Sequence, residues 1–167
     1  MKLSKTVLSV LSIAIIGILA LGLTSTPAFA STTTGTIAVT ATVTSQCTLS
    51  TTGLSFGTYY GAVTNATAIL TINCGNGIPY TVGLDGGSNG GTEGGTLYML
   101  LSGTTTLGYA VFQDAAHNTP WGNTTSNWLG QTGSGSNQNI NVYGQIPAGT
   151  PPAFGNYSDT IHVTINY

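Results

Sequence analysis

Few side chains in this sequence can carry chemistry. Its 167 residues include two Lys or Arg, four Asp or Glu, and two His. Asp114 and His117 are three residues apart and could share a metal ion or act as an acid and base pair, but either role needs a further group. No Gly-x-Ser-x-Gly motif is present, and a hydroxyl nucleophile would want a basic partner. We therefore expect both residues to be polar members of a surface loop, and no enzyme, cofactor or metal site.

The basic residues are confined to the start of the chain, at Lys2 and Lys5. A surface without cations cannot neutralise phosphates, so binding to nucleic acid or to anionic lipid is excluded. Charged residues make up 4% of the sequence, against about 25% in an ordinary soluble domain. Solubility must therefore rest on hydroxyl and amide groups, which suggests a protein that assembles.

Residues 1–30 have the layout of a secretory signal peptide. Both lysines precede an apolar run from Val7 to Leu23, and Pro27 leads into a small-residue pattern that ends at Ala30. The alternative is a retained membrane anchor, because the run is slightly longer than an ordinary signal core. We expect cleavage after Ala30, which removes both lysines and leaves a secreted chain of residues 31–167 with four acidic side chains. No direct membrane insertion is expected after cleavage.

The cysteines, Cys47 and Cys74, both fall in the mature chain. In an oxidising compartment a disulfide is the natural interpretation, rather than a metal pair. Closing a loop of that length would stabilise the fold by about 3 to 4 kcal/mol on the chain-entropy model. Their spacing excludes a Cys-x-x-Cys redox site.

Short runs in which apolar and polar residues alternate, separated by clusters of Gly, Asn and Ser, predict a sandwich of antiparallel strands. No stretch has helical periodicity. The clearest predicted strands are Thr36 to Thr44, Ala68 to Cys74, Tyr80 to Leu84, Tyr109 to Gln113, Gln138 to Val142 and Thr160 to Tyr167.

The predicted strands at the two ends of the mature chain are one-sided. In the first, four apolar residues share one face, namely Ile37, Val39, Ala41 and Val43. In the last, one face carries Ile161, Val163, Ile165 and Tyr167. Both could simply be ordinary strands of a closed sandwich, and composition alone favours that interpretation.

The order of these stretches resembles the spore coat protein U domain family, which includes the major subunits of archaic chaperone-usher pili. The resemblance covers essentially the whole mature chain, and the paired cysteines and terminal aromatic residue add to its specificity. One departure lies at residues 116–118, where family members usually carry Arg or Lys; it affects the surface charge of a fibre rather than the fold. The matching stretches are 34–47, Ile72-Asn-Cys74, 80–87, 108–116, 142–148 and 155–167.

The resemblance implies an all-β fold: an incomplete immunoglobulin-like β-sandwich, completed by donor-strand complementation from the next subunit. Residues 31–46 would be the N-terminal donor-strand extension and residues 47–167 the pilin domain. The donor-strand residues would be Ile37, Val39, Ala41 and Val43. The wall of the acceptor groove, and the contact with a chaperone, would be formed by Ile161, Val163, Ile165 and Tyr167.

The implied function is that of a structural subunit of a surface pilus or fimbria that supports adhesion and biofilm formation. Its partners would be identical or related pilin subunits, a periplasmic chaperone and an outer-membrane usher. It would pass through the periplasm to the cell surface.

Two other functions stay open. One is a spore-coat or extracellular-matrix structural protein of the same fold. The other is a secreted carbohydrate-binding module, although core packing would consume several of the aromatic residues that could stack on sugars. Those residues are Tyr98, Tyr109, Trp121 and Trp128.

Overall fold

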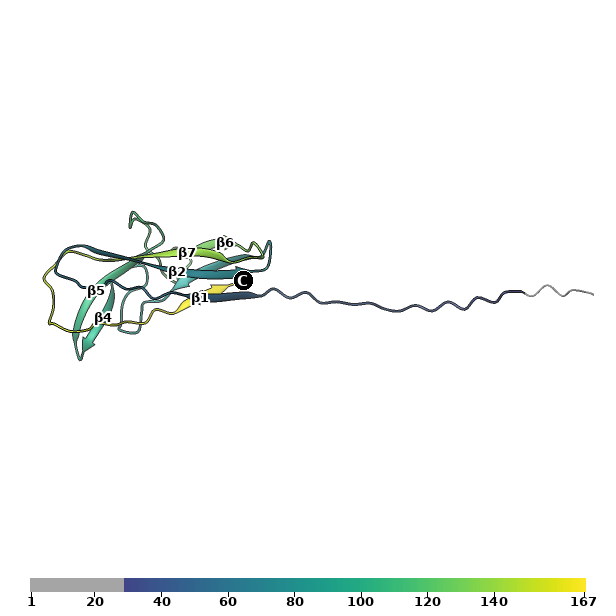
Figure 1. Cartoon of the computed structure of the whole chain (residues 1–167), viewed down its shortest axis with the longest axis horizontal. Coiled ribbons are helices and arrows are strands. Elements are labelled where there is room, and N and C mark those ends of the chain that lie inside the picture. Colours follow the sequence, from purple (N-terminus) through teal and green to yellow (C-terminus); the bar gives the residue numbers. More distant parts are fainter. Residues whose placement is uncertain (1–28) are drawn as a thin grey trace, which may run out of the picture. The chain divides into compact units, whose positions relative to one another are not determined.

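The computed structural model describes residues 29–167, and these contain β-strands but no helix. The strands are β1 (Cys47–Thr51), β2 (Thr64–Cys74), β3 (Pro79–Leu84), β4 (Leu97–Ser102), β5 (Thr105–Phe112), β6 (Leu129–Thr132), β7 (Gln138–Ile146) and β8 (Val163–Asn166) (Figure 1). Within the described range no helix could cross a membrane. The expected signal peptide falls on residues 1–30, of which 1–28 lie outside the described residues.

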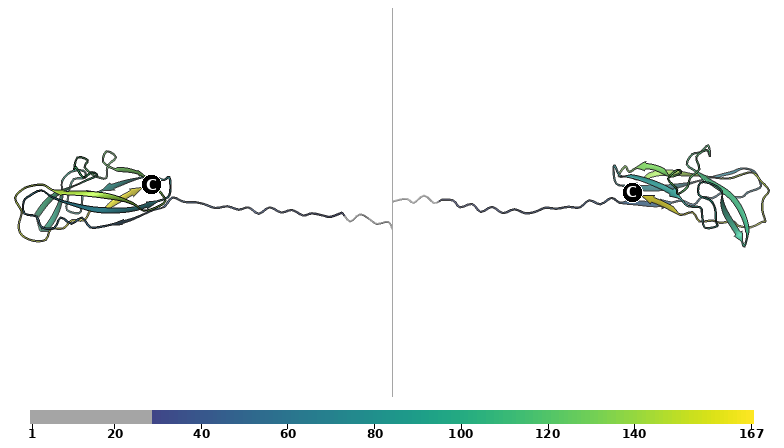
Figure 2. Two further views of the ribbon diagram at one scale, coloured as in Figure 1. Left: turned by 45° about the horizontal axis from the view of Figure 1, so that its top comes forward. Right: turned by 180° about the vertical axis from the view of Figure 1, so that it is seen from behind.

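The strands form two antiparallel sheets. The larger has the order β1-β2-β7-β5-β4 and the smaller the order β6-β3-β8. The two sheets lie face to face in an immunoglobulin-like sandwich, as the two views of Figure 2 show. The all-β fold class expected from the sequence is confirmed.

Alternation along each strand explains why these segments pair. In β2 the side chains of Ala68, Leu70 and Ile72 are buried, whereas the intervening Ile69 and Thr71 point away from the core. The neighbouring strand β7, which pairs with β2 in the same sheet, has the same two-residue period, and its Val142 is buried between more exposed neighbours. A two-residue period places every second side chain on one face of a sheet.

The core lies between the sheets, and its largest fully buried side chain is Trp121. The indole Nε1 of Trp121 donates a hydrogen bond of 2.9 Å to the carbonyl oxygen of Val82 in β3. This bond satisfies the one polar group of a side chain that otherwise only packs. The buried hydrophobic residues are Ala68, Leu70, Ile72, Cys74, Tyr80, Val82, Leu84, Leu97, Tyr109, Val111, Trp121, Val142 and Ile146.

The expected disulfide is confirmed. Cys47 opens β1 and Cys74 closes β2, and the two residues lie opposite each other in the antiparallel pairing. Their sulfur atoms are 2.05 Å apart. The bond therefore attaches an edge strand of the larger sheet to its neighbour.

The first predicted strand is wrong for the single chain. Residues 36–44 form no strand, and residues 29–46 as a whole have exposed side chains and no regular structure. A strand exists only where a neighbour pairs its N–H and C=O groups. The last predicted strand is shorter than expected, because β8 begins at Val163. Three observed strands were not among those predicted: β1, β4 and β6.

The chain also divides into two units, residues up to Thr40 and residues from Ala41 onward. All eight strands belong to the second unit.

Candidate functional site: an open groove between two strand edges

A groove of about 410 Å³ opens between the end of β1, with the segment that follows it, and the segment that leads into β8. β1 and β8 are each one edge strand of their sheets. Among the described residues β1 pairs with β2 alone, and β8 pairs with β3 alone. Each strand therefore presents one row of unpaired N–H and C=O groups. Such edges can pair with a further strand.

The floor of the groove is the core itself, seen from its open side. It is predominantly apolar and draws on both sheets, so a side chain entering the groove would contact the interior of the sandwich directly. The apolar residues that line it are Leu54, Phe56, Ala68, Leu70, Leu84, Met99, Val142, Ile161 and Val163.

Leu49 shows that the core is uncovered along this line. It lies in β1 directly opposite the fully buried Ile72 and points toward the same side of the sheet. Its side chain is nevertheless 38% exposed. An inward-facing leucine in a closed sandwich would be covered by its neighbours. The exposed Leu49 side chain can therefore still contact a further apolar side chain.

Two of the four predicted groove residues, Ile161 and Val163, line the groove. Ile161, Val163 and Ile165 are half-buried and pack against the core, and Val163 and Ile165 lie opposite the buried Leu84 and Val82 of β3. Tyr167 follows the end of β8 and is 58% exposed. The structure does not test whether any of the four contacts a partner.

The predicted donor residues are all exposed. Ile37, Val39 and Val43 have exposed fractions of 90%, 88% and 95%, and Ala41 is exposed as well. Large aliphatic side chains that exposed, recurring at every second position, form an apolar stripe that the single chain leaves in water. Their assignment to a donor strand stays a prediction.

The wall is built by a segment that crosses from one sheet to the other. Ser158 forms an isolated bridge with Leu100 of β4, with backbone hydrogen bonds of 2.9 and 3.1 Å in the two directions. Five residues later Val163 pairs with Leu84 of the other sheet. Residues 159–162 therefore span the gap between the sheets at one end of the groove.

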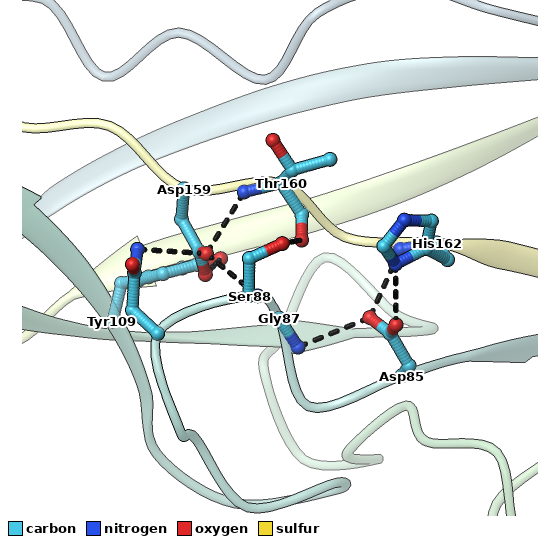
Figure 3. Close-up of polar contacts among 8 residues, drawn as sticks. Asp85, Gly87, Ser88, Tyr109, Asp159, Thr160 and His162 are labelled. Atoms are coloured by element: carbon cyan, nitrogen blue, oxygen red, sulfur yellow. Dashed lines mark hydrogen bonds and ion pairs between the residues drawn. The ribbon is translucent and has the colours of Figure 1, made fainter.

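Asp159 anchors the start of this crossing, and Figure 3 shows its partners. Its Oδ2 accepts a hydrogen bond of 2.7 Å from the hydroxyl of the buried Tyr109. Its Oδ1 accepts hydrogen bonds from the Asn89 side chain and from the Ser88 backbone N–H. Burial, with the adjacent Asp159 carboxylate as a second cause, raises the pKa of Tyr109 well above its usual range. The phenol therefore remains a proton donor to Asp159.

Asp85 anchors the end of the crossing. Its Oδ1 accepts hydrogen bonds from the backbone N–H groups of His162 and Gly87, and its Oδ2 lies 2.7 Å from Nδ1 of His162. Desolvation would raise the pKa of Asp85, but these hydrogen bonds and the His162 ring lower it below its usual range. We call the group formed by Asp85, Ser88, Asn89, Tyr109, Asp159 and His162 the crossover cluster.

Gly87 lets the loop after β3 reach the crossover cluster. Its φ is +74°, a conformation that residues with a Cβ rarely adopt. A Cβ at this position would also collide with the Asp159 carboxylate. The glycine-rich loop at residues 85–91 is thus a backbone cradle for a carboxylate of the same chain.

The other pair singled out in the sequence has a structural role. Asp114 closes a loop, because its carboxylate accepts hydrogen bonds from the backbone N–H groups of Ala116, Asn118 and Thr119. The His117 ring packs edge-on against Phe112, with ring centroids 5.1 Å apart. Across residues 29–167 no three His, Cys, Asp or Glu side chains gather as metal ligands do.

The aromatic residues proposed for sugar stacking do not form a platform. Tyr109 and Trp121 are 3% and 1% exposed and belong to the core. Tyr98 is 37% exposed on β4. The indole Nε1 of Trp128 is buried and has no hydrogen-bond partner within the described residues.

Sequence reasoning missed the crossover cluster, apart from naming Tyr109 for another reason. A signal was present: Asp85 and Asp159 are two of the four acidic residues in the sequence. Because charged residues are so rare in this sequence, an acidic residue next to a predicted strand indicates a carboxylate that accepts structural hydrogen bonds. The pairing could not be found, because Tyr109 and Asp159 are 50 residues apart and Asp85 and His162 are 77 apart.

Comparison with known proteins adds three findings. The family model of the Spore Coat Protein U domain matches residues 33–164. Protein U of Myxococcus xanthus is 29% identical over 127 residues, which cover 68% of this chain and 71% of that protein.

The third finding is a solved structure, the CsuC-CsuE chaperone-tip adhesion subunit pre-assembly complex from archaic chaperone-usher Csu pili of Acinetobacter baumannii. One of its chains matches with a TM-score of 0.56 and 26% identity, over 75% of this chain. This chain covers 40% of the length of that solved chain.

Proposed function

Since the chain belongs to the Spore Coat Protein U domain family, we propose that it is a structural subunit of a surface pilus, assembled by donor-strand exchange and supporting adhesion and biofilm formation. The observation that carries the proposal is the apolar groove between two unpaired strand edges. The same chain holds a matching apolar stripe, exposed at residues 37–43.

The apolar stripe can supply the strand and the buried side chains that would fill the groove. Residues 37–43 in strand conformation span about 20 Å, with alternate side chains on one face. If Ile37, Val39 and Val43 of one subunit enter the groove of another, each fully buried side chain contributes about 1.5 to 3 kcal/mol. We call residues 35–45 the donor segment.

Backbone hydrogen bonds would add specificity to this burial. The donor segment would lie between β1 and β8 and bond to both, which joins the two sheets along the open side. Strand addition of this kind combines main-chain hydrogen bonds with pockets for alternate side chains. Ala38, Thr40 and Thr42, at the intervening positions, would face away from the core.

An empty groove needs protection before assembly. Leu49 and the groove floor would otherwise meet water or the groove of another subunit, and uncovered apolar edges aggregate. We infer that a periplasmic chaperone covers the groove in transit and that an outer-membrane usher exchanges it for the next subunit's donor segment. The solved relative is a pre-assembly complex of a chaperone with a subunit, which supports this route.

Self-complementation tests the proposal. In one variant residues 31–46 are deleted; in a second, the donor segment is moved behind Tyr167 on a short flexible linker. Because β8 runs toward the C-terminus along the groove, the moved segment can fold back beside it. We expect the second variant to be a monomer whose melting temperature exceeds that of the deleted variant by more than about 10 °C.

The matched control carries the moved segment with Val39→Asp and Val43→Asp, which keep its length and remove its apolar stripe. It should melt like the deleted variant. Equal melting temperatures for all three proteins would mean that the sandwich has no vacancy, and would contradict the proposal.

A coat or matrix protein of the same fold is the second candidate, favoured by the similarity to Protein U. The two functions separate on genetics. A pilus subunit should appear in surface fibres on electron micrographs, and these should disappear when the usher gene is deleted, whereas a coat protein should form a surface layer without fibres.

A further inference from the structure

The groove continues into a second hollow. This hollow measures about 550 Å³ and is lined by the segment that follows β1 and by residues 151–157, which lead toward the crossing. Four residues line both hollows, so they stand between them, and all four are half-buried, so part of each side chain still faces the groove. We call these four residues the ridge: Leu54, Phe56, Met99 and Tyr157.

The ridge rests on the inner face of the larger sheet. Gly144 is buried in β7, and Leu54 and Phe56 fill the space that a side chain there would occupy, since their nearest atoms lie 2.8 Å from where its Cβ would be. The Phe56 ring also packs edge-on against the Tyr109 ring, with centroids 5.8 Å apart. Side chains packed in this way yield little. A strand laid over the ridge must therefore fit its height, because these side chains cannot sink further.

The apolar stripe of the donor segment contains one small residue. Ala41 stands between Val39 and Val43, which lie about 13 Å apart along a strand. Over an open hollow an alanine would leave a void, and a void forfeits the contacts that a larger side chain would make. Over a raised floor the preference reverses, because a larger side chain would be overpacked. The order large, small, large along the stripe therefore matches the order hollow, ridge, hollow along the groove.

We propose that Ala41 of an incoming donor segment lies over the ridge of the subunit that accepts it, with Val39 and Val43 entering the hollows on its two sides. The inference rests on the proposed function, because it gives the donor segment its register. The match does not depend on which way the donor segment runs, since both neighbours of Ala41 on that face are valine. The ridge makes the groove selective, because an extension with a large residue at the centre of its stripe cannot seat in this register.

An alanine on each face of the donor segment supplies a matched pair of variants. Ala41→Leu puts three more carbon atoms over the ridge, whereas Ala38→Leu adds the same atoms on the face turned away from the core. Full-length fibres of each variant are heated and scored by the temperature at which their multimers dissociate on gels. We expect Ala41→Leu fibres to dissociate about 4 to 12 °C lower, or not to form, and Ala38→Leu fibres to match the unsubstituted protein.

A second substitution, in the ridge itself, locates the contact. Leu54→Ala removes the three carbon atoms that Ala41→Leu adds, so the double variant A41L/L54A should recover the dissociation temperature lost by Ala41→Leu. Met99→Ala, which removes three atoms from another strand, takes its place if Leu54→Ala prevents folding. Recovery of this kind is expected for side chains in contact and not for distant ones.

Dissociation of Ala41→Leu fibres at the temperature of the Ala38→Leu control would overturn the inference. So would a loss in Ala41→Leu that neither ridge substitution restores, because Ala41 would then enter the groove away from the ridge. Both outcomes leave the proposed function standing, since the unsubstituted protein and Ala38→Leu would still form fibres. An unsubstituted protein that forms no fibres would contradict the proposed function instead.

Discussion

At the scale of single residues, the crossover cluster concentrates half of the chain's carboxylates at one end of the groove. Asp159 accepts hydrogen bonds from Tyr109, Ser88 and Asn89, so a charged group sits beside the core with its oxygens satisfied. Burying a carboxylate is costly unless it is hydrogen-bonded in this way. The cluster therefore ties the crossing segment to the body of the sandwich.

Replacing Tyr109 by Phe should measure how much the hydrogen bond between Tyr109 and Asp159 stabilises the fold. The substitution keeps the buried ring and removes the hydroxyl that Asp159 Oδ2 accepts from. We expect a loss of about 1.5 to 3 kcal/mol in the free energy of unfolding, because the acceptor is charged. Urea denaturation of the self-complemented monomer would measure it. Tyr98→Phe is the matched control, since Tyr98 is partly exposed on β4, and an equal loss there would contradict the role of the hydrogen bond.

Acid should weaken the hydrogen bonds that Asp85 accepts at the end of the crossing segment. The pKa of Asp85 is lowered from its ordinary value of 3.8 in the folded chain, so the unfolded chain takes up the proton first. The stability that this carboxylate contributes is present above pH 3.8 and is lost as the pH falls through the lower, folded pKa. Asp85→Asn should therefore flatten the fall in stability below about pH 4.

Thermal melts of the self-complemented monomer across that range of pH would follow the effect. Asp114, whose pKa is also lowered by backbone hydrogen bonds despite desolvation, should keep part of the acid slope. Glu93→Gln is the control for the loss of an exposed carboxylate, because the Glu93 side chain accepts no hydrogen bond within the described residues. A slope that Asp85→Asn leaves as steep as before would rule out this role.

At the scale of elements, the groove is a missing strand position between β1 and β8. Both edge strands are short, with five and four residues. β1 turns the exposed Leu49 to the core side of its sheet, and β8 carries the half-buried Val163 and Ile165. β1 is fastened by the disulfide and β8 by the crossover cluster. The disulfide thus fixes β1 and the crossover cluster fixes the segment before β8. Both sides of the groove are held in place, so the groove stays open for a strand.

Two neighbouring substitutions in the donor segment separate its faces. Val39→Asp would bring an unpaired charge into the apolar groove, which costs several kcal/mol and should stop polymerisation. Thr40→Asp adds the same charge one residue along, where the two-residue period turns it to the opposite face and solvent can reach it. That variant should polymerise normally.

Fibre yield can be scored by electron microscopy and by the ladder of heat-sensitive multimers on gels. If both variants polymerise alike, the donor assignment is wrong. If Thr40→Asp alone fails, the register is shifted and the opposite face is the one that enters the groove.

At the scale of the whole molecule, the proposed assembly makes each subunit both donor and acceptor, through separate parts of the chain. Residues 29–46 carry the stripe and no strand, whereas all eight strands and the groove lie from Cys47 onward. Removing the extension should therefore leave acceptor function intact and abolish donor function. Such a chain can end a fibre but cannot extend it.

Co-expression of the protein lacking residues 31–46 with the full-length protein should shorten fibres in proportion to its share. Fibre length measured on micrographs tests this. The deleted protein that also carries Leu49→Asp on the core side of edge strand β1 is the control, because a charge where the donor segment would pair should block acceptance as well and restore normal length. Unchanged length with the first variant would mean that the extension and the groove do not act as a pair.

Much of the architecture follows from local pattern. The alternation in β2, β3 and β7, the glycine-rich loops between strands and the pairing of two cysteines in a secreted chain are properties of nearby residues, and the sandwich and the disulfide were predictable from them. Two of the three strands that escaped prediction, β4 and β6, have no such pattern. β4 reads Leu-Tyr-Met-Leu-Leu-Ser, a continuous apolar run, and β6 has only four residues. They are strands because their neighbours in the sheets pair with them.

What the sequence determined by itself is therefore periodicity and composition: which face of each strand is apolar, and that charges are almost absent. Tertiary structure decided what those faces meet. Only the fold placed Asp159 against Tyr109 and Asp85 against His162, because contacts across 50 and 77 residues depend on loop closure and not on local pattern. Only the fold left the groove open between β1 and β8, since a strand's partner is chosen by the whole sheet. The apolar stripe at residues 37–43 can be recognised in the sequence alone. Whether these residues form a strand depends on a neighbouring strand that pairs with them.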